Sequence, residues 1–516
     1  MRKDQPTYPG LGQIEHGDYL QDIPYEDYIG GEQALPEGER VFDIRQYGAV
    51  PDGESLNTEA FAAACEDLRR AGGGVLLVQG GTYVTGTVRL PSRCTLFVAD
   101  DAVLMASRDA DQLISRQDGT QDFGDESSGG ALISAVDAEK IRITGGGVIH
   151  GQGEWFVHPA RKKPSFEPFE PVLLPRRDQA AEINIVPGSL RTAYRDRIRY
   201  AEDKYGEGKP VLRRPSALVW FLRCRDIRVD HIILRDSMCW TLHLETCDDI
   251  LIEHMVIDDN RHVANADGID LSGCRFAEIK HCFISCADDG LCVKNPAASG
   301  RSSGHLHFSG CKVCTVMNAF KIGTGTRYDI SDVTVEDCDF FMTDIYPGST
   351  SGISIESCDG SHLSGITARR IRMHGIQCPL YILLNRRNQS GAPFTSDENS
   401  VYWGGSITDV LVEDITADRA DLPAILTGYL DGRVRKPLRN ITVRNYIVRY
   451  RECPEVLQLP EVYDEFLTEY PECNAHGDVN ACGLWIQHAD HVTLENVAVI
   501  PRKADSRPVI VQMDVR

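Results

Sequence analysis

Three aspartates lie close together in residues 265–294, which read NADGIDLSGCRFAEIKHCFISCADDGLCVK. Asp267 belongs to the NADG segment, and Asp288 and Asp289 belong to the ADDG segment one strand-like repeat later. Hydrolysis of a glycosidic bond needs such carboxylates, because one group protonates the leaving oxygen while ionised partners activate a water. The pattern therefore predicts a catalytic carboxylate site.

Asp288 and Asp289 are adjacent, and adjacent residues of a straight strand point to opposite faces. Both side chains can reach one site only if the backbone turns there, and the Gly290 that follows permits such a turn. An ordinary Asp-Gly turn would explain ADDG taken alone. The pairing of ADDG with NADG one repeat earlier favours a shared site.

The composition describes a soluble globular chain with a large core, since 42% of its 516 residues are hydrophobic and 25% are charged. The net charge of −22 argues against nucleic acid or an anionic membrane as a partner. No apolar run is long enough to span a membrane. The expected partner is a carbohydrate substrate, and the oligomeric state is left open.

The 17 cysteines are scattered through strand-like segments, and the N-terminus shows no apolar secretion signal. These features predict a cytoplasmic protein with reduced, mostly buried thiols. Cys311 and Cys314 form a lone CxxC, which lacks the second pair expected of a zinc site. We expect no metal and no cofactor.

A short phrase recurs along the chain, in which a few polar residues precede an alternating apolar strand and a turn. It reads DIRVDHIILRD, DILIEHMVIDD, AEIKHCFISC and DVTVEDCDFF, and the clearest neighbouring repeats lie 23 to 27 residues apart. A propeller blade would need about forty residues, and a βαβ array would need helices between the strands. The pattern predicts an all-β fold, a right-handed parallel β-helix (a solenoid).

The predicted organisation is an N-terminal extension over residues 1–40 followed by a catalytic β-helix over residues 41–516. Residues 57–74 have helical spacing of apolar residues and a glycine stop, so we expect a helix that caps the first coil. Segments at about 154–214 and 452–481 break the repeat. Long insertions into a repeat scaffold often shape the binding face.

The chain resembles glycoside hydrolase family 28, the polygalacturonase family of right-handed parallel β-helix enzymes. The resemblance is carried, in the family's order, by FDIRQYGAVPDG, GGGVIHGQGEWF, MCWTLHLETCDDILIEHMVI, NADGIDL and ADDGLCVK. It implies that Asn265 and Asp267 correspond to the family's NTDG motif, and Asp288 and Asp289 to its DD motif. One aspartate of the DD pair would then be the general acid, and the other two would activate water with inversion.

Two motifs of that family differ in this chain. The sequence has VMNAFKIG where the family has GHG, and ISIES where it has RIK, so that Ser354 and Glu356 replace a basic pair. In the family this pair faces the galacturonate carboxylate. A glutamate there would repel a uronic acid by about a few kcal/mol at an effective dielectric of about 20. The difference predicts a preference for a neutral or deoxy sugar.

Further substrate-binding candidates are Asn265, Trp240, Lys294, Lys321 and Glu356. Trp240 would stack on a sugar ring, although a tryptophan in a coil equally often packs inside it. Lys294 and Lys321 would keep a carboxylate ionised and bind a hydroxyl, or would face solvent. Glu356 would accept hydrogen bonds from neutral sugar hydroxyls.

The favoured interpretation is an inverting, exo-acting glycoside hydrolase that acts on an oligosaccharide or small glycoside. Inversion predicts acid and base carboxyls roughly 6.5–9.5 Å apart. A pectin-type polysaccharide lyase or uronate epimerase on the same fold is the first alternative. A non-catalytic carbohydrate-binding β-helix is the second, and the sugar and linkage are left open.

Overall fold

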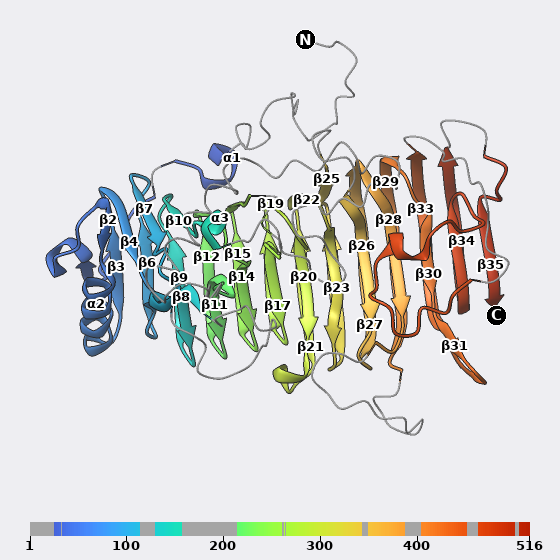
Figure 1. The fold of residues 1–516 in the computed structure, drawn as a ribbon, viewed down its shortest axis with the longest axis horizontal. Coiled ribbons are helices and arrows are strands. Elements are labelled where there is room, and N and C mark those ends of the chain that lie inside the picture. The colour runs from blue at the N-terminus through green and yellow to red at the C-terminus, as the bar shows by residue number, and fades with distance from the viewer. Residues whose placement is uncertain are drawn as a thin grey trace, which may run out of the picture.

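The computed structural model describes residues 25–31, 33–113, 130–156, 214–260, 263, 265–342, 349–387, 404–450, 463–500 and 505–516. Their strands wind into coils that stack along one long axis, from α2 at one end to β35 at the other (Figure 1). Apart from the β31–β32 hairpin, the described strand pairs of these coils are parallel. The predicted parallel β-helix is confirmed.

Each coil contributes strands to three parallel ladders. The ladder that carries the aspartates consists of β5 (Val88–Arg89), β8 (Ala131–Val136), β11 (Ala217–Leu222), β14 (Trp240–Glu245), β17 (Ile269–Ser272), β20 (Leu291–Asn295), β23 (Asn318–Thr326), β26 (Ser349–Ser357), β28 (Ile376–Leu384), β30 (Ala424–Thr427), β34 (Leu484–Ile500) and β35 (Ile510–Val515). We call it the site ladder.

The second ladder consists of β1 (Val41–Asp43), β3 (Gly74–Val78), β6 (Cys94–Val98), β9 (Glu139–Thr144), β12 (Arg225–Asp230), β15 (Asp248–Glu253), β18 (Arg275–Lys280), β21 (Ser303–Ser309), β24 (Ile330–Glu336), β27 (His362–His374), β29 (Ser406–Ala420) and β33 (Leu438–Tyr450). The third consists of β2 (Asp52–Leu56), β4 (Gly81–Thr85), β7 (Ala102–Ala106), β10 (Val148–His150), β13 (Ile233–Arg235), β16 (Val256–Asp258), β19 (Phe283–Cys286), β22 (Lys312–Thr315) and β25 (Asp339–Phe341). The hairpin joins β31 (Tyr429–Asp431) to β32 (Val434–Lys436).

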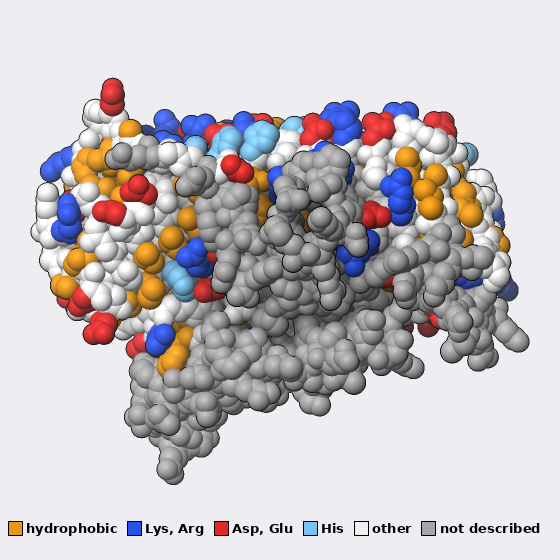
Figure 2. Space-filling model, turned by 90° about the horizontal axis from the view of Figure 1, so that it is seen from above, with side chains coloured by type: hydrophobic (Ala, Val, Ile, Leu, Met, Phe, Trp, Pro, Cys, Tyr) orange, Lys and Arg blue, Asp and Glu red, His pale blue; other side chains and the backbone are white. Residues whose placement is uncertain are grey.

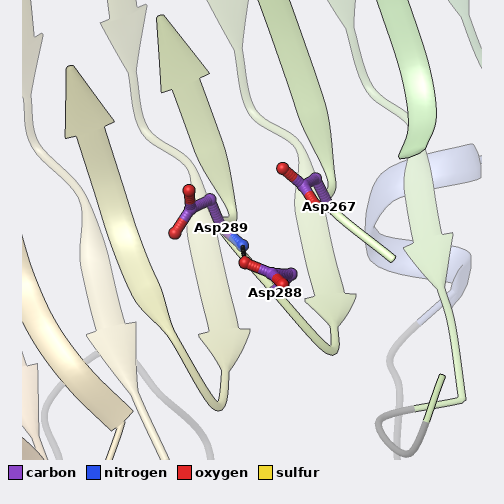
Figure 3. Close-up of side chains that lie close together, drawn as sticks. All are labelled: Asp267, Asp288 and Asp289. Carbon is purple, nitrogen blue, oxygen red and sulfur yellow. Dashed lines mark hydrogen bonds between the residues drawn. The ribbon is translucent and has the colours of Figure 1, made fainter. Parts of the chain in front are cut away.

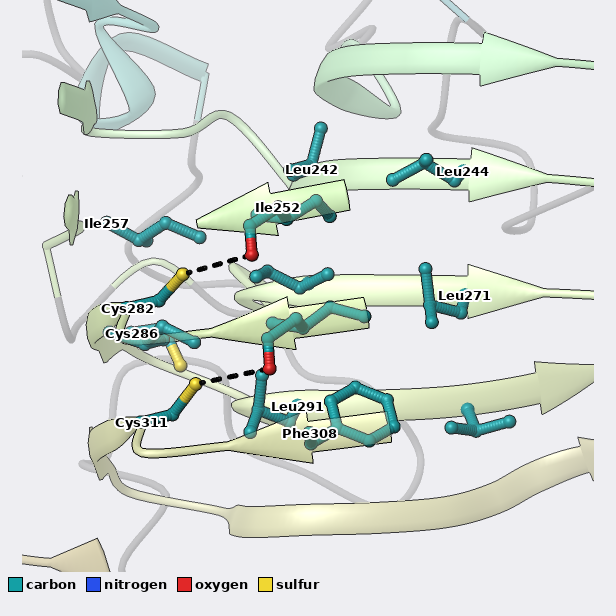
Figure 4. Packing of buried hydrophobic residues seen from close by; sticks show 14 of the residues in the cluster. Leu242, Leu244, Ile252, Ile257, Leu271, Cys282, Cys286, Leu291, Phe308 and Cys311 are labelled. Atoms are coloured by element: carbon teal, nitrogen blue, oxygen red, sulfur yellow. Dashed lines mark hydrogen bonds between the residues drawn. The ribbon is translucent and has the colours of Figure 1, made fainter. Parts of the chain in front are cut away.

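The core lies inside the coils, where like side chains stack on one another. Ile227 pairs with Ile250, and Ile252 pairs with Ile279, each of them buried. Cysteines join these stacks: the Cys282 thiol lies 3.9 Å from the Ile252 carbonyl oxygen (Figure 4). All sixteen described cysteines are buried and free, as expected. The location of the protein in the cell stays a prediction.

Helix α2 (Thr58–Ala71) covers the N-terminal coil and confirms the predicted cap. It buries Phe61, Ala64 and Leu68 and ends at Gly72, whose φ of +82° is the left-handed conformation that suits glycine. The other helical segments are α1 (Tyr25–Ile29), α3 (Gly153–Phe156), η2 (Ile44–Tyr47), η3 (Ala110–Gln112), η4 (Ala297–Ser299) and η5 (Cys473–His476). None of the described helices is long and apolar enough to cross a membrane.

Part of the predicted N-terminal extension packs on the solenoid, since the ring of Tyr28 in α1 lies 5.5 Å from that of Phe283. Residues 1–24, most of the 154–214 insertion and residues 452–462 lie outside the described residues. The outer surface of the coils is charged, and Figure 2 shows acidic, basic and histidine side chains gathered along one long edge. Ion pairs join neighbouring strands of the second ladder, such as Arg228–Glu253 between β12 and β15 and Arg444–Glu413 between β33 and β29.

The described part of the second insertion, residues 463–481, lies across the outer face of the C-terminal coils, in front of β28 and β30 in Figure 1. Its Phe466 and Cys473 pack in a separate hydrophobic cluster with Tyr381 and Trp485 of the site ladder. The segment is therefore fixed on the same ladder that carries the aspartates.

Candidate active site

The three aspartates stand at the turns that lead into two neighbouring strands of the site ladder (Figure 3). Asp267 precedes β17, while Asp288 and Asp289 precede β20, and the strands pair with Ile269 opposite Leu291. The backbone N–H of Gly268 donates to the carbonyl oxygen of Asp289 at 2.9 Å, which holds the two turns together. The structure thus brings the predicted trio into one place.

Gly290, which follows the aspartate pair, packs closely against the next coil. A Cβ at this position would lie 2.4 Å from Val313 Cγ1 and 2.8 Å from the carbonyl oxygen of Ala319. The backbone φ angle of Gly290 is not positive. Any larger residue would push ADDG away from the next coil.

One oxygen from each carboxylate lies within 4.8 Å of the others, close enough that the three could hold a cation. The predicted spacing of roughly 6.5–9.5 Å is therefore wrong for these atoms. The cause is the fold, because neighbouring strands of a ladder lie only about 4.8 Å apart. Asp267 and Asp289 are 3% and 5% exposed, whereas Asp288 is half-buried.

Lys294, on β20, forms an ion pair with Asp267. Its Nζ lies 2.9 Å from Asp267 Oδ2, also donates to Asp270 Oδ1, and sits 3.9 Å from the centre of the Trp240 ring. Burial lowers the pKa of Lys294, but the two carboxylates outweigh it and raise that pKa well above its ordinary value. Lys294 is thus a buried cation that holds a candidate catalytic carboxylate, and it does not lie on a solvated face.

Burial raises the pKa of Asp267, and it raises that of Asp270 to about 6, while the Lys294 ammonium opposes both shifts. The Lys294 ammonium thus forms ion pairs with both carboxylates. Trp240 is 6% exposed and packs with Trp220 in a small apolar cluster, with its ring against Lys294. Packing, the second interpretation of Trp240, is what the structure shows.

Lys321, on β23, is the ammonium partner of Asp289, as Lys294 is of Asp267. Its Nζ lies 3.5 Å from Asp289 Oδ2, 3.7 Å from Glu356 Oε1 and 3.5 Å from Glu472 Oε1. At 1% exposure, Lys321 does not face solvent. Asn318 Nδ2 donates to Asp289 Oδ1 at 2.8 Å, so both oxygens of Asp289 have a partner.

Glu356 does not contact the open site, which corrects the prediction that it binds sugar hydroxyls directly. It is fully buried, accepts from the Ser354 hydroxyl at 2.6 Å and faces Lys321. Burial raises the pKa of Glu356 to about 7, with Lys321 opposing. Glu356 therefore acts on the site through Lys321, by holding its ammonium in place.

Asn265 lies next to Asp288 in a left-handed conformation, with φ of +59°. Its Nδ2 donates to Asp288 Oδ2 at 3.5 Å, and its Oδ1 accepts from Arg214 at 3.2 Å. This arrangement orients the half-buried aspartate.

Sequence reasoning missed Asp270, Asn318 and Glu472. Asn318 stands in the VMNAFKIG segment that was noticed only as a difference, and Asp270 lies two residues after NADG. Glu472 lies far along the chain, in the second insertion, and no spacing in the sequence links it to Lys321. Packing of the 463–481 segment brings it there.

The sequence model of glycosyl hydrolases family 28 matches residues 201–461, just over half of the chain, including all three aspartates. The chain belongs to glycoside hydrolase family 28. It is a glycoside hydrolase, and its substrate is a carbohydrate. A probable polygalacturonase from Vitis vinifera is 24% identical over 419 residues, which cover 78% of this chain and 73% of the relative. Across four plant polygalacturonases the chain spans 60–73% of their length.

Solved structures share the fold of this family. The exopolygalacturonase of Thermotoga maritima superposes with a TM-score of 0.62 at 17% identity, over 92% of this chain and 95% of that one. A family 28 exopolygalacturonase of Yersinia enterocolitica gives the same TM-score and identity, over 92% and 77%. At this identity the likeness establishes the β-helix alone.

Proposed function

We propose that Asp267, Asp288 and Asp289 hydrolyse a glycosidic bond at the end of an oligosaccharide or in a small glycoside. The observation that carries this proposal is the convergence of the three carboxylates within 4.8 Å, with a buried ammonium beside two of them. Asp289 faces the Lys321 ammonium and accepts a hydrogen bond from Asn318, a setting suited to holding a water. Of the adjacent pair, Asp289 is therefore the base and Asp288 the general acid.

In this mechanism Asp267 and Asp289 hold one water between them. Two hydrogen bonds of about 2.8 Å that diverge at a roughly tetrahedral angle span about 4.6 Å. Asp288 protonates the glycosidic oxygen as its bond to the anomeric carbon breaks. The water attacks that carbon from the opposite side and gives its proton to the carboxylate pair.

A single displacement of this kind inverts the anomeric carbon. The short carboxyl spacing by itself resembles that of retaining enzymes, about 5–5.5 Å. The ammonium partners of Asp267 and Asp289 favour inversion instead, because an ion-paired carboxylate is a weak nucleophile that still binds water. Proton NMR of the first-formed product distinguishes the two outcomes, since a product that keeps the anomeric configuration of the substrate contradicts the water-holding role.

Exo action is supported by the 463–481 segment, which packs on the outer face of the site ladder and brings Glu472 within 3.5 Å of Lys321. A segment that lies beside the catalytic residues limits how far a polymer chain can extend past them. Digestion of reduced oligosaccharides should release one terminal unit at a time. A random ladder of products would contradict exo action.

A lyase or epimerase is less well supported. Those enzymes need a cation to neutralise a uronate, and both described lysines of the site are engaged by carboxylates. A non-catalytic role gives no reason to bury so many charges, because burial of ionised groups is costly. Product analysis on aryl glycosides and oligosaccharides tests this choice: hydrolysis yields a new reducing end, whereas a lyase yields an unsaturated product that absorbs in the ultraviolet.

A further inference from the structure

A group of polar side chains lies around Lys321, the lysine that also faces Asp289. The Tyr470 ring centre is 6.0 Å from Lys321 Nζ and 5.5 Å from Arg387 Cζ, and Glu472 Oε1 is 3.5 Å from Lys321 Nζ. Arg387 follows β28 on the chain, whereas Tyr470 and Glu472 come from the second insertion. We call Arg387, Tyr470 and Glu472 the end cluster.

Hydrogen bonds made by residues next to Arg387 and Glu472 hold the end cluster in place. The backbone N–H of Arg386 donates to the carbonyl oxygen of Leu467 at 2.9 Å, next to Arg387. The Cys473 thiol lies 3.3 Å from the carbonyl oxygen of Thr350, next to Glu472. The cluster therefore belongs to the packed solenoid.

Two buried atoms of the end cluster have no hydrogen-bond partner among the described residues. They are Glu472 Oε2, on a residue that is 5% exposed, and Arg387 Nε, on a side chain that is 10% exposed. Buried polar groups are normally paired. Glu472 Oε2 can accept a hydrogen bond and Arg387 Nε can donate one, and the Tyr470 ring lies 5.5 Å from Arg387 Cζ.

We propose that the end cluster is a subsite for a neutral terminal sugar. One hydroxyl of the sugar donates to Glu472 Oε2, a second accepts from Arg387 Nε, and the apolar face of the ring packs on Tyr470. This assignment rests on the proposed glycosidase function and names the class of terminal unit that the site takes. Sugar hydroxyls both donate and accept, so they match a mixed pair of this kind.

A terminal uronate fits less well, because acidic side chains already share the Lys321 ammonium. Asp289, Glu356 and Glu472 surround this one ammonium within 3.7 Å, and Arg387 lies 3.7 Å from Asp359. A further carboxylate would meet acceptors and like charges at contact distance. The preference for a neutral sugar therefore follows from the surroundings of Lys321, even though Glu356 does not touch the sugar.

The test uses 4-nitrophenyl glycosides, with α-galactoside and α-galacturonide as a pair that differs only at C6, and with rhamnosides, xylosides and arabinosides of both anomers alongside. The wild type should cleave a neutral glycoside with a higher kcat/KM than the galacturonide. Glu472→Gln and Arg387→Ala should each raise KM for the neutral glycoside about 10- to 100-fold, the loss expected for one charge-assisted hydrogen bond, with kcat changed less than about threefold. The exposed Glu469→Gln is the matched control and should keep both constants.

Preference for the galacturonide, or no cleavage of any neutral probe, would overturn the subsite. So would an unchanged KM in both variants, provided that their thermal unfolding matches the wild type. Asp288→Asn separates the two proposals. If this variant loses turnover while KM is unchanged in the end-cluster variants, the glycosidase function stands and the subsite fails. If it keeps turnover, the catalytic assignment fails.

Discussion

Lys321→Met removes the ammonium that Asp289, Glu356 and Glu472 share at 3.5–3.7 Å. At an effective dielectric of 20, one unit-charge pair at 3.5 Å amounts to about 5 kcal/mol before desolvation. Removal of one partner of a buried ion pair destabilises proteins by about 3–5 kcal/mol. We expect a loss of free energy of unfolding of this size at pH 8, where Glu356 is ionised in the wild type and pairs with the Lys321 ammonium.

The loss should be smaller at pH 5.5. Burial raises the pKa of Glu356 to about 7 and that of Glu472 to about 8, with Lys321 opposing both shifts. A carboxyl group with a raised pKa binds its proton more tightly in the folded state. Its stabilising contribution is complete below the unfolded pKa, near 4.3, and is lost as the pH rises through 7 to 8. At pH 5.5 both groups carry protons, so the variant should lose only about 1–2 kcal/mol.

The same substitution should also lower kcat/KM, because the Lys321 ammonium lies 3.5 Å from Asp289 Oδ2 and helps to position that carboxylate. Thermal unfolding at the two pH values and steady-state kinetics measure both effects. The exposed Lys140→Met is the control. Equal destabilisation at pH 5.5 and pH 8, together with an unchanged kcat/KM, would refute the reasoning.

Three further predictions concern the trio and its surroundings. Asp288→Asn should reduce turnover by about 10² to 10⁴-fold with little change in the unfolding temperature, because a positioned acid contributes that factor and this residue is half-buried; near-wild-type turnover would exclude Asp288 as the acid. Full activity is expected after treatment with a chelator, since Asp267 and Asp289 already have ammonium partners, and a loss that only added metal restores would contradict this. Glu356→Lys should not produce a polygalacturonase, because it would place a second ammonium in the fully buried position that faces Lys321, and the variant should unfold at a lower temperature; efficient cleavage of polygalacturonate by it would be the contrary result.

The sequence determined the fold because its information is local and repeated. Apolar residues such as Ile252 and Ile279 recur once per coil, and stacking of like positions is how a solenoid builds one core. NADG and ADDG occupy equivalent positions in neighbouring coils, so the repeat alone placed Asp267 beside Asp289. The cap formed by α2 was equally predictable, from the helical spacing of its apolar residues and the glycine that ends it.

The tertiary structure decided what surrounds those aspartates. The distance between coils set the carboxyl spacing at 4.8 Å or less, below the value predicted from the chemistry. Glu356, predicted to bind sugar, is buried and pairs with Lys321. Trp240 is also buried, with its ring against Lys294. Glu472 reaches the site only because the 463–481 segment packs back across the ladder, a contact that joins residues 151 positions apart. Such contacts depend on how an insertion folds onto the scaffold, and no period in the chain encodes them.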